Sequence, residues 1–309
     1  MTAATTRPFP YRLPLLFSLI VLFLVFAAQT TGFVKEGLSL CAHTVIPALF
    51  PHLVLSDLLS AEIGGQQKKG LTATLCRYLR LPSCTPILFL AGALCGFPIG
   101  ARLAVQLQKK GVLSPESAKD LAAFTNNTSP AFLVGAVGAS LFSSPRIGWL
   151  LLASQLTASF LCLVLTRPLR PALKADDLRA IEPKGAPSLV DAIRRAASTM
   201  LAISAFILFF SVVSGFVLLW FPRLALPLVS FLEVSNACRT ASGIYASAPA
   251  PVLAWTAFAV GFGGLSASMQ SAMCAKEAGI SLKGYLPRKL LVGILTAIIF
   301  FVLTWIASV

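Results

Sequence analysis

The sequence predicts an all-α membrane protein with about seven transmembrane helices and two opposed re-entrant hairpins in an inverted repeat. Three observations lead to this prediction. The chain is 57% hydrophobic and only 12% charged, about half of the charged share of soluble domains. The apolar residues gather in segments of about 20, the length that crosses a bilayer. Four segments are interrupted by Gly, Pro or polar residues, in a similar order in the two halves of the chain.

The N-terminal region, residues 1–85, contains two predicted spans and a polar cytoplasmic loop. The first span covers residues 13–31, although its basic flank and the sequence Ala27-Ala28-Gln29 also fit a cleavable signal peptide, which is the alternative. The second span covers residues 38–60. Asp57 lies near its end, where we expect it to be solvated or to cap the helix.

Residues 86–166 form the first predicted repeat. Residues 86–107 contain two arms joined by Gly and Pro, and each arm reaches about 15 Å, half of a bilayer. We expect a re-entrant hairpin, with one kinked full span as the alternative. Residues 120–142 are expected to form a broken helix, because polar residues and Pro130 interrupt them at mid-depth. Residues 147–166 form an uninterrupted span.

A hydrophilic cytoplasmic linker, residues 167–200, and a connecting span, residues 201–222, separate this repeat from the second one, residues 224–307. The second repeat is expected to follow the same order of hairpin, broken helix and continuous helix, at residues 224–247, 252–275 and 290–307.

The distribution of basic residues predicts the orientation. With the N-terminus in the cytoplasm and both hairpins returning to the side that they leave, twenty basic residues are cytoplasmic, Lys289 among them, and three are outside. A full crossing at residues 86–107 would weaken this bias. The two hairpins then enter from opposite sides, and inverted repeats with broken helices are typical of secondary transporters. The net charge of +14 indicates contact with anionic lipid headgroups rather than nucleic acid, because the basic residues lie in short clusters between apolar segments.

The four interruptions are expected to meet near mid-membrane and to bind a small-molecule substrate. Helix N-termini there suit anions, and unwound carbonyl groups suit cations. Interhelical packing is the alternative role of the neutral candidates, which are Asn126, Asn127, Ser129, Asn236, Ser266, Ser268 and Gln270.

Three charged residues stand out in the interrupted segments. Glu233 is one of two acids within apolar segments, where a carboxylate needs a partner, a cavity or a proton. We expect it to function at the site, with an ion pair to Arg239 or Arg102 as the alternative. The two arginines occupy similar places in the two hairpins and could together bind an anion with two carboxylates. Alternatively, each side chain extends to the nearer interface.

No motif of a soluble enzyme is present, neither a P-loop nor GxSxG, HExxH or an acid dyad. We therefore expect neither an enzyme nor an ATP-driven pump. The seven cysteines and two histidines show no metal-ligand spacing, and the thiols are expected to be buried and free. No cofactor is expected, and H⁺ and Na⁺ both remain open as the coupling ion.

Four motifs resemble those of the sporulation integral membrane protein YlbJ family. They are CGFPIGARLA at residues 95–104, AFTNNTSPAFLVGAVG at 123–138, FLEVSNA at 231–237 and GFGGLSASMQ at 261–270. That family belongs to the nucleoside-recognition (Gate) domain group, which is similar to concentrative nucleoside transporters. The resemblance covers roughly residues 38–305. It implies two opposed hairpins and two unwound helices around a central site, often in a trimer.

The resemblance also implies a role in spore formation and cortex development, in the bacterial cell membrane or the membrane around the forespore. Dipicolinate movement is the transport role that it implies, and the two arginines would suit this dicarboxylate. The alternatives are a scaffold or assembly factor for the spore envelope and a nucleoside transporter, although the first hairpin tip lacks the Gln/Thr/Glu cluster of nucleoside carriers. The substrate-binding positions implied are Phe97, Pro98, Gly100, Asn126, Asn127, Ser129, Glu233, Ser235, Asn236, Ser266, Ser268 and Gln270.

Overall fold

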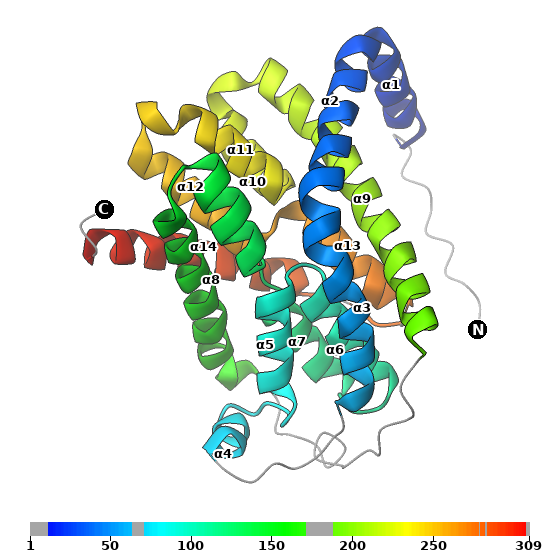
Figure 1. Cartoon of the computed structure of the whole chain (residues 1–309), viewed down its shortest axis with the longest axis vertical. Helices are drawn as coiled ribbons and strands as arrows, with labels where there is room; N and C mark the ends of the chain where they lie inside the picture. The colour runs from blue at the N-terminus through cyan, green and yellow to red at the C-terminus, as the bar shows by residue number, and fades with distance from the viewer. Residues whose placement is uncertain (1–11, 64–70, 171–187, 278, 282, 307–309) are drawn as a thin grey trace.

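The computed structural model describes residues 12–63, 71–170, 188–277, 279–281 and 283–306 (Figure 1). All regular elements in these ranges are helical. Five helical stretches in these ranges are long and apolar enough to cross a bilayer, and shorter apolar helices accompany them. The chain is therefore an integral, multi-pass membrane protein. These stretches are Ala27–Ser60, Pro145–Leu165, Leu189–Trp220, Pro249–Lys276 and Tyr285–Ile306.

The bounds predicted for the first two spans are wrong. Helix α1 has 14 residues and is about 21 Å long, too short to cross a bilayer core of about 30 Å. A turn at Phe26 separates it from a continuous helical stretch that contains both the end of the predicted first span and the whole second span. Apolar residues run through this turn without Gly or Pro, so composition gave no boundary. The elements are α1 (Arg12–Val25), α2 (Ala27–Leu40), the π-helix η1 (Cys41–Val45) and α3 (Ile46–Glu62).

The first repeat begins after the short helix α4 (Leu71–Tyr78). The two arms predicted for residues 86–107 are present as helices of 11 residues each, with Gly96, Phe97 and Pro98 between them. The predicted break in the next segment is present at residues 125–129. The elements are α5 (Thr85–Cys95), α6 (Ile99–Lys109), α7 (Pro115–Phe124), the π-helix η2 (Ala131–Leu141) and α8 (Pro145–Leu165).

Helix α9 (Leu189–Trp220) is continuous over 32 residues, so residues 189–200 belong to this helix and not to a linker. It begins where Ser188 caps it, since the Ser188 hydroxyl accepts a hydrogen bond from the Asp191 amide. The short 3-10 helix η3 (Arg167–Leu169) lies at the start of the predicted linker. Most of that linker, residues 171–187, lies outside the described residues, as do Arg7, Lys68 and Lys69 from the charge count.

The second repeat has the same order of elements. The unwinding predicted from Gly263 to Gln270 is confined to Gly263 and Gly264, whose φ angles of +82° and +79° break the helix. The small and polar residues that follow are helical. The elements are α10 (Ala225–Leu232), α11 (Val234–Ile244), α12 (Pro249–Phe262), α13 (Gly264–Glu277) and α14 (Tyr285–Ile306), and Glu233 separates the first two.

The packing of the two repeats is reciprocal. Helix α6 packs against α7 of its own repeat and α13 of the other, while α11 packs against α12 of its own repeat and η2 of the other. In the same way α14 contacts α7 and α8 contacts α12. Figure 1 shows the pair α5–α6 in the lower half of the molecule and α10–α11 in the upper half. The interrupted points of both repeats are thereby brought to the middle.

Candidate functional site

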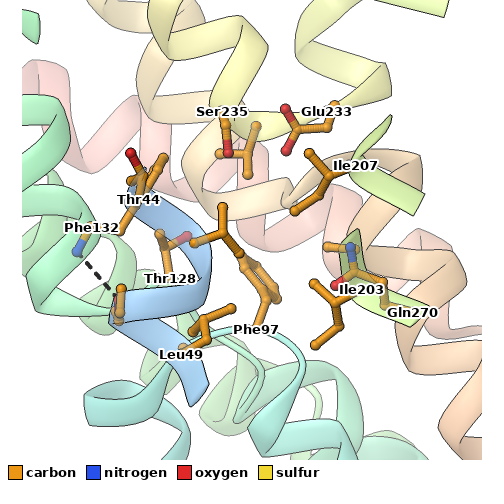
Figure 2. Close-up of a pocket in the computed structure, with 16 residues that line it drawn as sticks. Thr44, Leu49, Phe97, Thr128, Phe132, Ile203, Ile207, Glu233, Ser235 and Gln270 are labelled. Atoms are coloured by element: carbon orange, nitrogen blue, oxygen red, sulfur yellow. Dashed lines mark hydrogen bonds between the residues drawn. The ribbon is translucent and has the colours of Figure 1, made fainter. Parts of the chain in front are cut away.

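A cavity of about 70 Å³ lies where the interrupted segments meet (Figure 2). Three of the interruptions contribute directly to its lining, and the fourth segment contributes Ala267 and Gln270 of α13, just after its break. Residues of η1, α3 and α9 complete the lining. The polar lining side chains are Thr44, Thr128, Ser129, Glu233, Ser235 and Gln270, and the larger apolar ones are Leu49, Phe97, Phe132, Ile203 and Ile207. The cavity therefore offers hydroxyl and amide groups on walls that are otherwise apolar.

Helices begin beside this cavity, so their N-terminal amide groups lie near it. Two of the N-termini are capped by cavity residues. The Phe132 amide donates to Ser129 Oγ at 3.3 Å at the start of η2, and the Asn236 amide donates to Glu233 Oε2 at 2.7 Å at the start of α11. Helix α6 begins after Pro98 without a side-chain cap. Its N-terminus is thus an end at which a bound anion could be stabilised.

Glu233 is 3% exposed and caps α11 from the break between α10 and α11. It forms neither of the ion pairs considered from the sequence, because Arg102 pairs with Asp57 and Arg239 pairs with Glu36. Its carboxylate is held by the helix N-terminus instead, which is a favourable place for a negative charge. The residue thus lines the cavity, and none of the described cations forms an ion pair with it.

Asn126 and Asn127 do not line the cavity, although both lie in the break between α7 and η2. Asn126 Nδ2 donates to Ser271 Oγ and Tyr285 Oη, each at 2.9 Å. The side-chain oxygen of Asn127 accepts from Ser159 Oγ at 2.7 Å. These side chains hold the unwound segment against α8, α13 and α14, which is the packing alternative considered from the sequence.

Lys289 on α14 is fully buried and contacts the same break. Its Nζ donates to the carbonyl oxygen of Asn126 at 2.9 Å and lies 4.9 Å from the centroid of the Phe97 ring. The count of Lys289 among cytoplasmic basic residues is therefore misleading, since the residue is 0% exposed and lies beside the site. No carboxylate pairs with it among the described residues.

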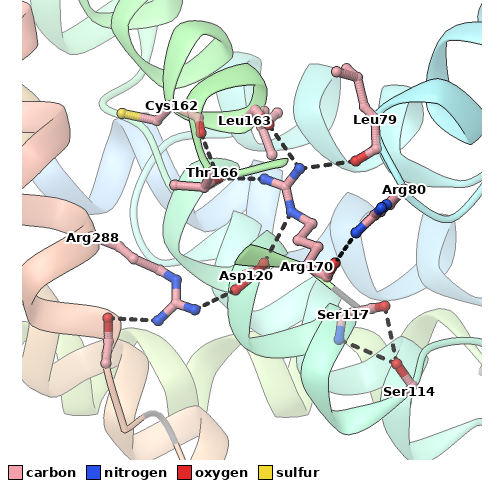
Figure 3. Close-up of polar contacts among 11 residues, drawn as sticks. Leu79, Arg80, Ser114, Ser117, Asp120, Cys162, Leu163, Thr166, Arg170 and Arg288 are labelled. Carbon is pink, nitrogen blue, oxygen red and sulfur yellow. Dashed lines mark hydrogen bonds and ion pairs between the residues drawn. The ribbon is translucent and has the colours of Figure 1, made fainter. Parts of the chain in front are cut away.

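The neighbouring residue, Arg288, anchors the start of α14 (Figure 3). Its Nη2 lies 2.7 Å from Asp120 Oδ1 on α7, and the other oxygen of Asp120 accepts from Arg170 Nε at 3.0 Å. Arg170 also donates to the carbonyl oxygens of Leu79 and Leu163. Burial lowers the pKa of Arg170, and the charge of Asp120 opposes this effect. The network fixes α14 relative to α7 and thereby Lys289 relative to the break.

The structure does not bring Arg102 and Arg239 to one site. Arg102 lies 2.8 Å from Asp57, while Arg239 Nη2 donates to Asn236 Oδ1 at 2.9 Å and its Nη1 lies 3.3 Å from Glu36. Only Arg102 is buried.

The expectation for Asp57 is also wrong, because Asp57 is 2% exposed and accepts from both Arg102 and Arg195. Its charge is buried because α6 and α9 each provide a guanidinium.

Other positions implied by the resemblance also lie outside the cavity lining. Pro98 directly precedes α6, Gly100 packs against the backbone of Thr125, and Asn236 donates to Ser211 Oγ at 3.1 Å. Ser266 accepts from Gln270, and Ser268 donates to the Gly264 carbonyl oxygen. Of the twelve positions, those at the cavity are Phe97, Ser129, Glu233, Ser235 and Gln270. Their binding of a substrate stays a prediction.

The sequence reasoning missed the contribution of η1, α3 and α9. Thr44 lies in the π-helix η1, three residues before Pro47, and irregular helix next to a proline is a signal that was available. Ile203 and Ile207 carry no such signal, because apolar residues on a long apolar helix are the norm. For Lys289 the available signal was a second charged residue, directly after Arg288, within the largely apolar helical segment Tyr285–Ile306.

One curated protein similar to this chain is sporulation integral membrane protein YlbJ of Bacillus subtilis (strain 168). The two are 28% identical over an alignment of 319 positions, which covers 88% of this chain and 76% of the relative. No protein-family model and no solved structure match the chain. The match extends over nearly all of the helices described above, including both repeats. The chain is therefore a homologue of sporulation integral membrane protein YlbJ.

Proposed function

We propose that this protein is a secondary transporter of a small anionic or polar metabolite that acts during spore formation. The observation that carries the proposal is the single cavity lined by four interrupted segments. Backbone interruptions at membrane depth are tolerated where protein or a water-filled cavity surrounds them. Sites formed by broken helices near the midplane are the common arrangement in secondary transporters.

The reciprocal packing supports an inverted repeat, with α5–α6 and α10–α11 as re-entrant hairpins that enter from opposite sides. Gly96 and Glu233 are 137 residues apart and both line the cavity, and Ser129 and Ser266 have the same separation. The N-terminus would be cytoplasmic by the excess of basic residues on that side. A cavity between two such repeats can open to either side in turn.

The lining favours a small ring compound with polar ends. Phe97 and Phe132 offer aromatic surface, and the hydroxyl and amide groups of the lining offer hydrogen-bond donors for a carboxylate. Dipicolinate has this chemistry. Spore formation, named for the curated relative, provides the setting in which it would be moved. Glu233 is the group in the cavity that could bind a coupling H⁺ or Na⁺.

The test is uptake of labelled dipicolinate, with uridine for comparison, into proteoliposomes that contain the purified protein. We expect uptake by the wild type and a loss of about ten-fold or more in Glu233→Gln, which keeps an oxygen to accept from the Asn236 amide. The matched control is Glu116→Gln, an exposed carboxylate on α7, which should transport normally.

A folded wild-type protein that takes up none of the tested solutes would contradict the proposal. A scaffold of the spore envelope would instead tolerate Glu233→Gln without a change in spore dipicolinate content. Measuring that content in spores of a strain with the Glu233→Gln variant separates the two functions.

A further inference from the structure

A second cavity, of about 240 Å³, lies between α6, α9 and α13. Its lining shares α9 and α13 with the first cavity. On α9 its lining residue Ala202 directly precedes Ile203 of the first cavity, and on α13 Met273 follows Gln270 by three positions, about one turn. The two cavities thus have neighbouring residues on two of their helices.

The second cavity has an excess of positive charge. Arg102, Lys109 and Arg195 line it, and the one carboxylate in contact with these groups is Asp57. Asp57 Oδ1 lies 2.8 Å from Arg102 Nη2, and its Oδ2 lies 2.8 Å from Arg195 Nε. One carboxylate thus faces two guanidinium groups, and the exposed Lys109 adds a third cation.

Two polar atoms in this wall lack a partner within the described residues. Arg102 is 7% exposed, yet its Nη1 has no hydrogen-bond partner, and the same holds for Oε1 of Gln106. A buried donor without an acceptor costs about 1–3 kcal/mol, and more where the group is charged. An oxygen of a bound anion would accept from Arg102 Nη1 and remove this cost, whereas Gln106 Oε1 is an acceptor and needs a donor, such as a hydroxyl group or water. The hydroxyl of Ser198 is a further polar group in the lining.

We propose that this second cavity binds a small dianion, a dicarboxylate or a phosphate compound, on its way to or from the central cavity. The inference rests on the proposed transport function and identifies its substrates as anions. Cations in a recess with low-dielectric walls raise the local concentration of anions. Guanidinium groups bind carboxylate and phosphate oxygens in pairs, which selects compact anions with two negative charges.

The test measures binding of succinate and of inorganic phosphate by calorimetry, with the full chain in nanodiscs of phosphatidylcholine alone. We expect the double variant Lys109→Gln/Arg195→Gln to bind succinate at least about ten-fold more weakly than the wild type, the effect of losing about 1.4 kcal/mol. Lys109→Gln alone leaves the Asp57 pairs intact and should weaken binding by about three-fold. Arg194→Gln, an exposed neighbour on α9 that does not line the cavity, should bind as the wild type does.

Equal succinate affinity in the wild type and the double variant would overturn the proposal. So would binding of phosphatidylglycerol at these residues without any binding of succinate in neutral lipid, because the cations would then serve lipid headgroups. Uptake measurements separate this inference from the transport function. Dianion binding without uptake supports the cavity and contradicts the carrier, whereas unchanged dianion uptake by the double variant supports the carrier and contradicts the cavity.

Discussion

Gly100 packs directly on the carbonyl group of Thr125, so that the first turn of α6 touches the end of α7. A Cβ atom at position 100 would overlap the Thr125 carbonyl oxygen, which is backbone and cannot rotate away. We expect Gly100→Ala to lower the stability by about 1–3 kcal/mol or more, because the two segments must separate. The thermal unfolding midpoint of the purified protein in detergent measures this effect.

The control for this substitution is Gly135→Ala in η2, where a Cβ atom meets nothing within 4 Å. Equal thermal unfolding midpoints for the two variants would show that the contact between α6 and Thr125 has room for a Cβ atom.

Replacing Lys289 separates stability from activity. A buried ammonium without a carboxylate partner is expensive, so Lys289→Met should leave the thermal midpoint unchanged or raise it. The same variant loses the hydrogen bond to the Asn126 carbonyl oxygen and the contact with the Phe97 ring. We expect proteoliposome uptake to fall by about ten-fold or more. Lys283→Met, at an exposed position, is the control. A strongly destabilised but active Lys289→Met protein would refute this assignment.

Asp120→Asn tests the ionic network at the start of α14. The variant removes the negative charge shared by Arg170 and Arg288 and leaves the 5% exposed Arg170 without a carboxylate. We expect a loss of about 3 kcal/mol, because a buried charge that loses its partner is poorly solvated. Denaturant titration of the purified protein gives the value. Asp191→Asn, at the exposed start of α9, should change the stability by less than about 1 kcal/mol.

Thr44→Cys tests whether water reaches the central cavity. Six of the seven native cysteines are buried, so the variant is made in a Cys95→Ser background. A small, charged thiol reagent should label Cys at position 44, and a transported substrate should slow the labelling. Thr296→Cys, whose parent residue is 0% exposed on α14, should stay unlabelled. Equal labelling at both positions, or none at position 44, would indicate that this cavity is not open to solutes.

The interruptions of the helices could be predicted from the sequence because Gly, Pro and polar residues act locally. The pair Gly96 and Pro98 stops α5 and starts α6, and the two glycines at 263 and 264 divide α12 from α13. These effects need no knowledge of the remainder of the fold. The breaks at residues 125–129 and at Glu233 followed in the same way from polar residues within apolar segments.

The partners of the polar residues could not be predicted, because they depend on which helices pack together. Asn126 meets Tyr285, and Asp57 meets Arg195, across separations of 159 and 138 residues. Composition alone also cannot tell a lysine at a membrane surface from one buried beside a break, as Lys289 illustrates.

The crossed packing of α6 on α13 and of α11 on η2 has a consequence for assembly of the chain. Helix α6 of the first half packs beside the break of the second half, and α11 of the second half packs beside the break of the first. Neither half therefore encloses the central cavity by itself. Severing the chain between α8 and α9 should therefore yield two fragments that gain their final shape only when they are made together. Such complementation would make the central chamber a late product of folding, completed when the second set of helices docks.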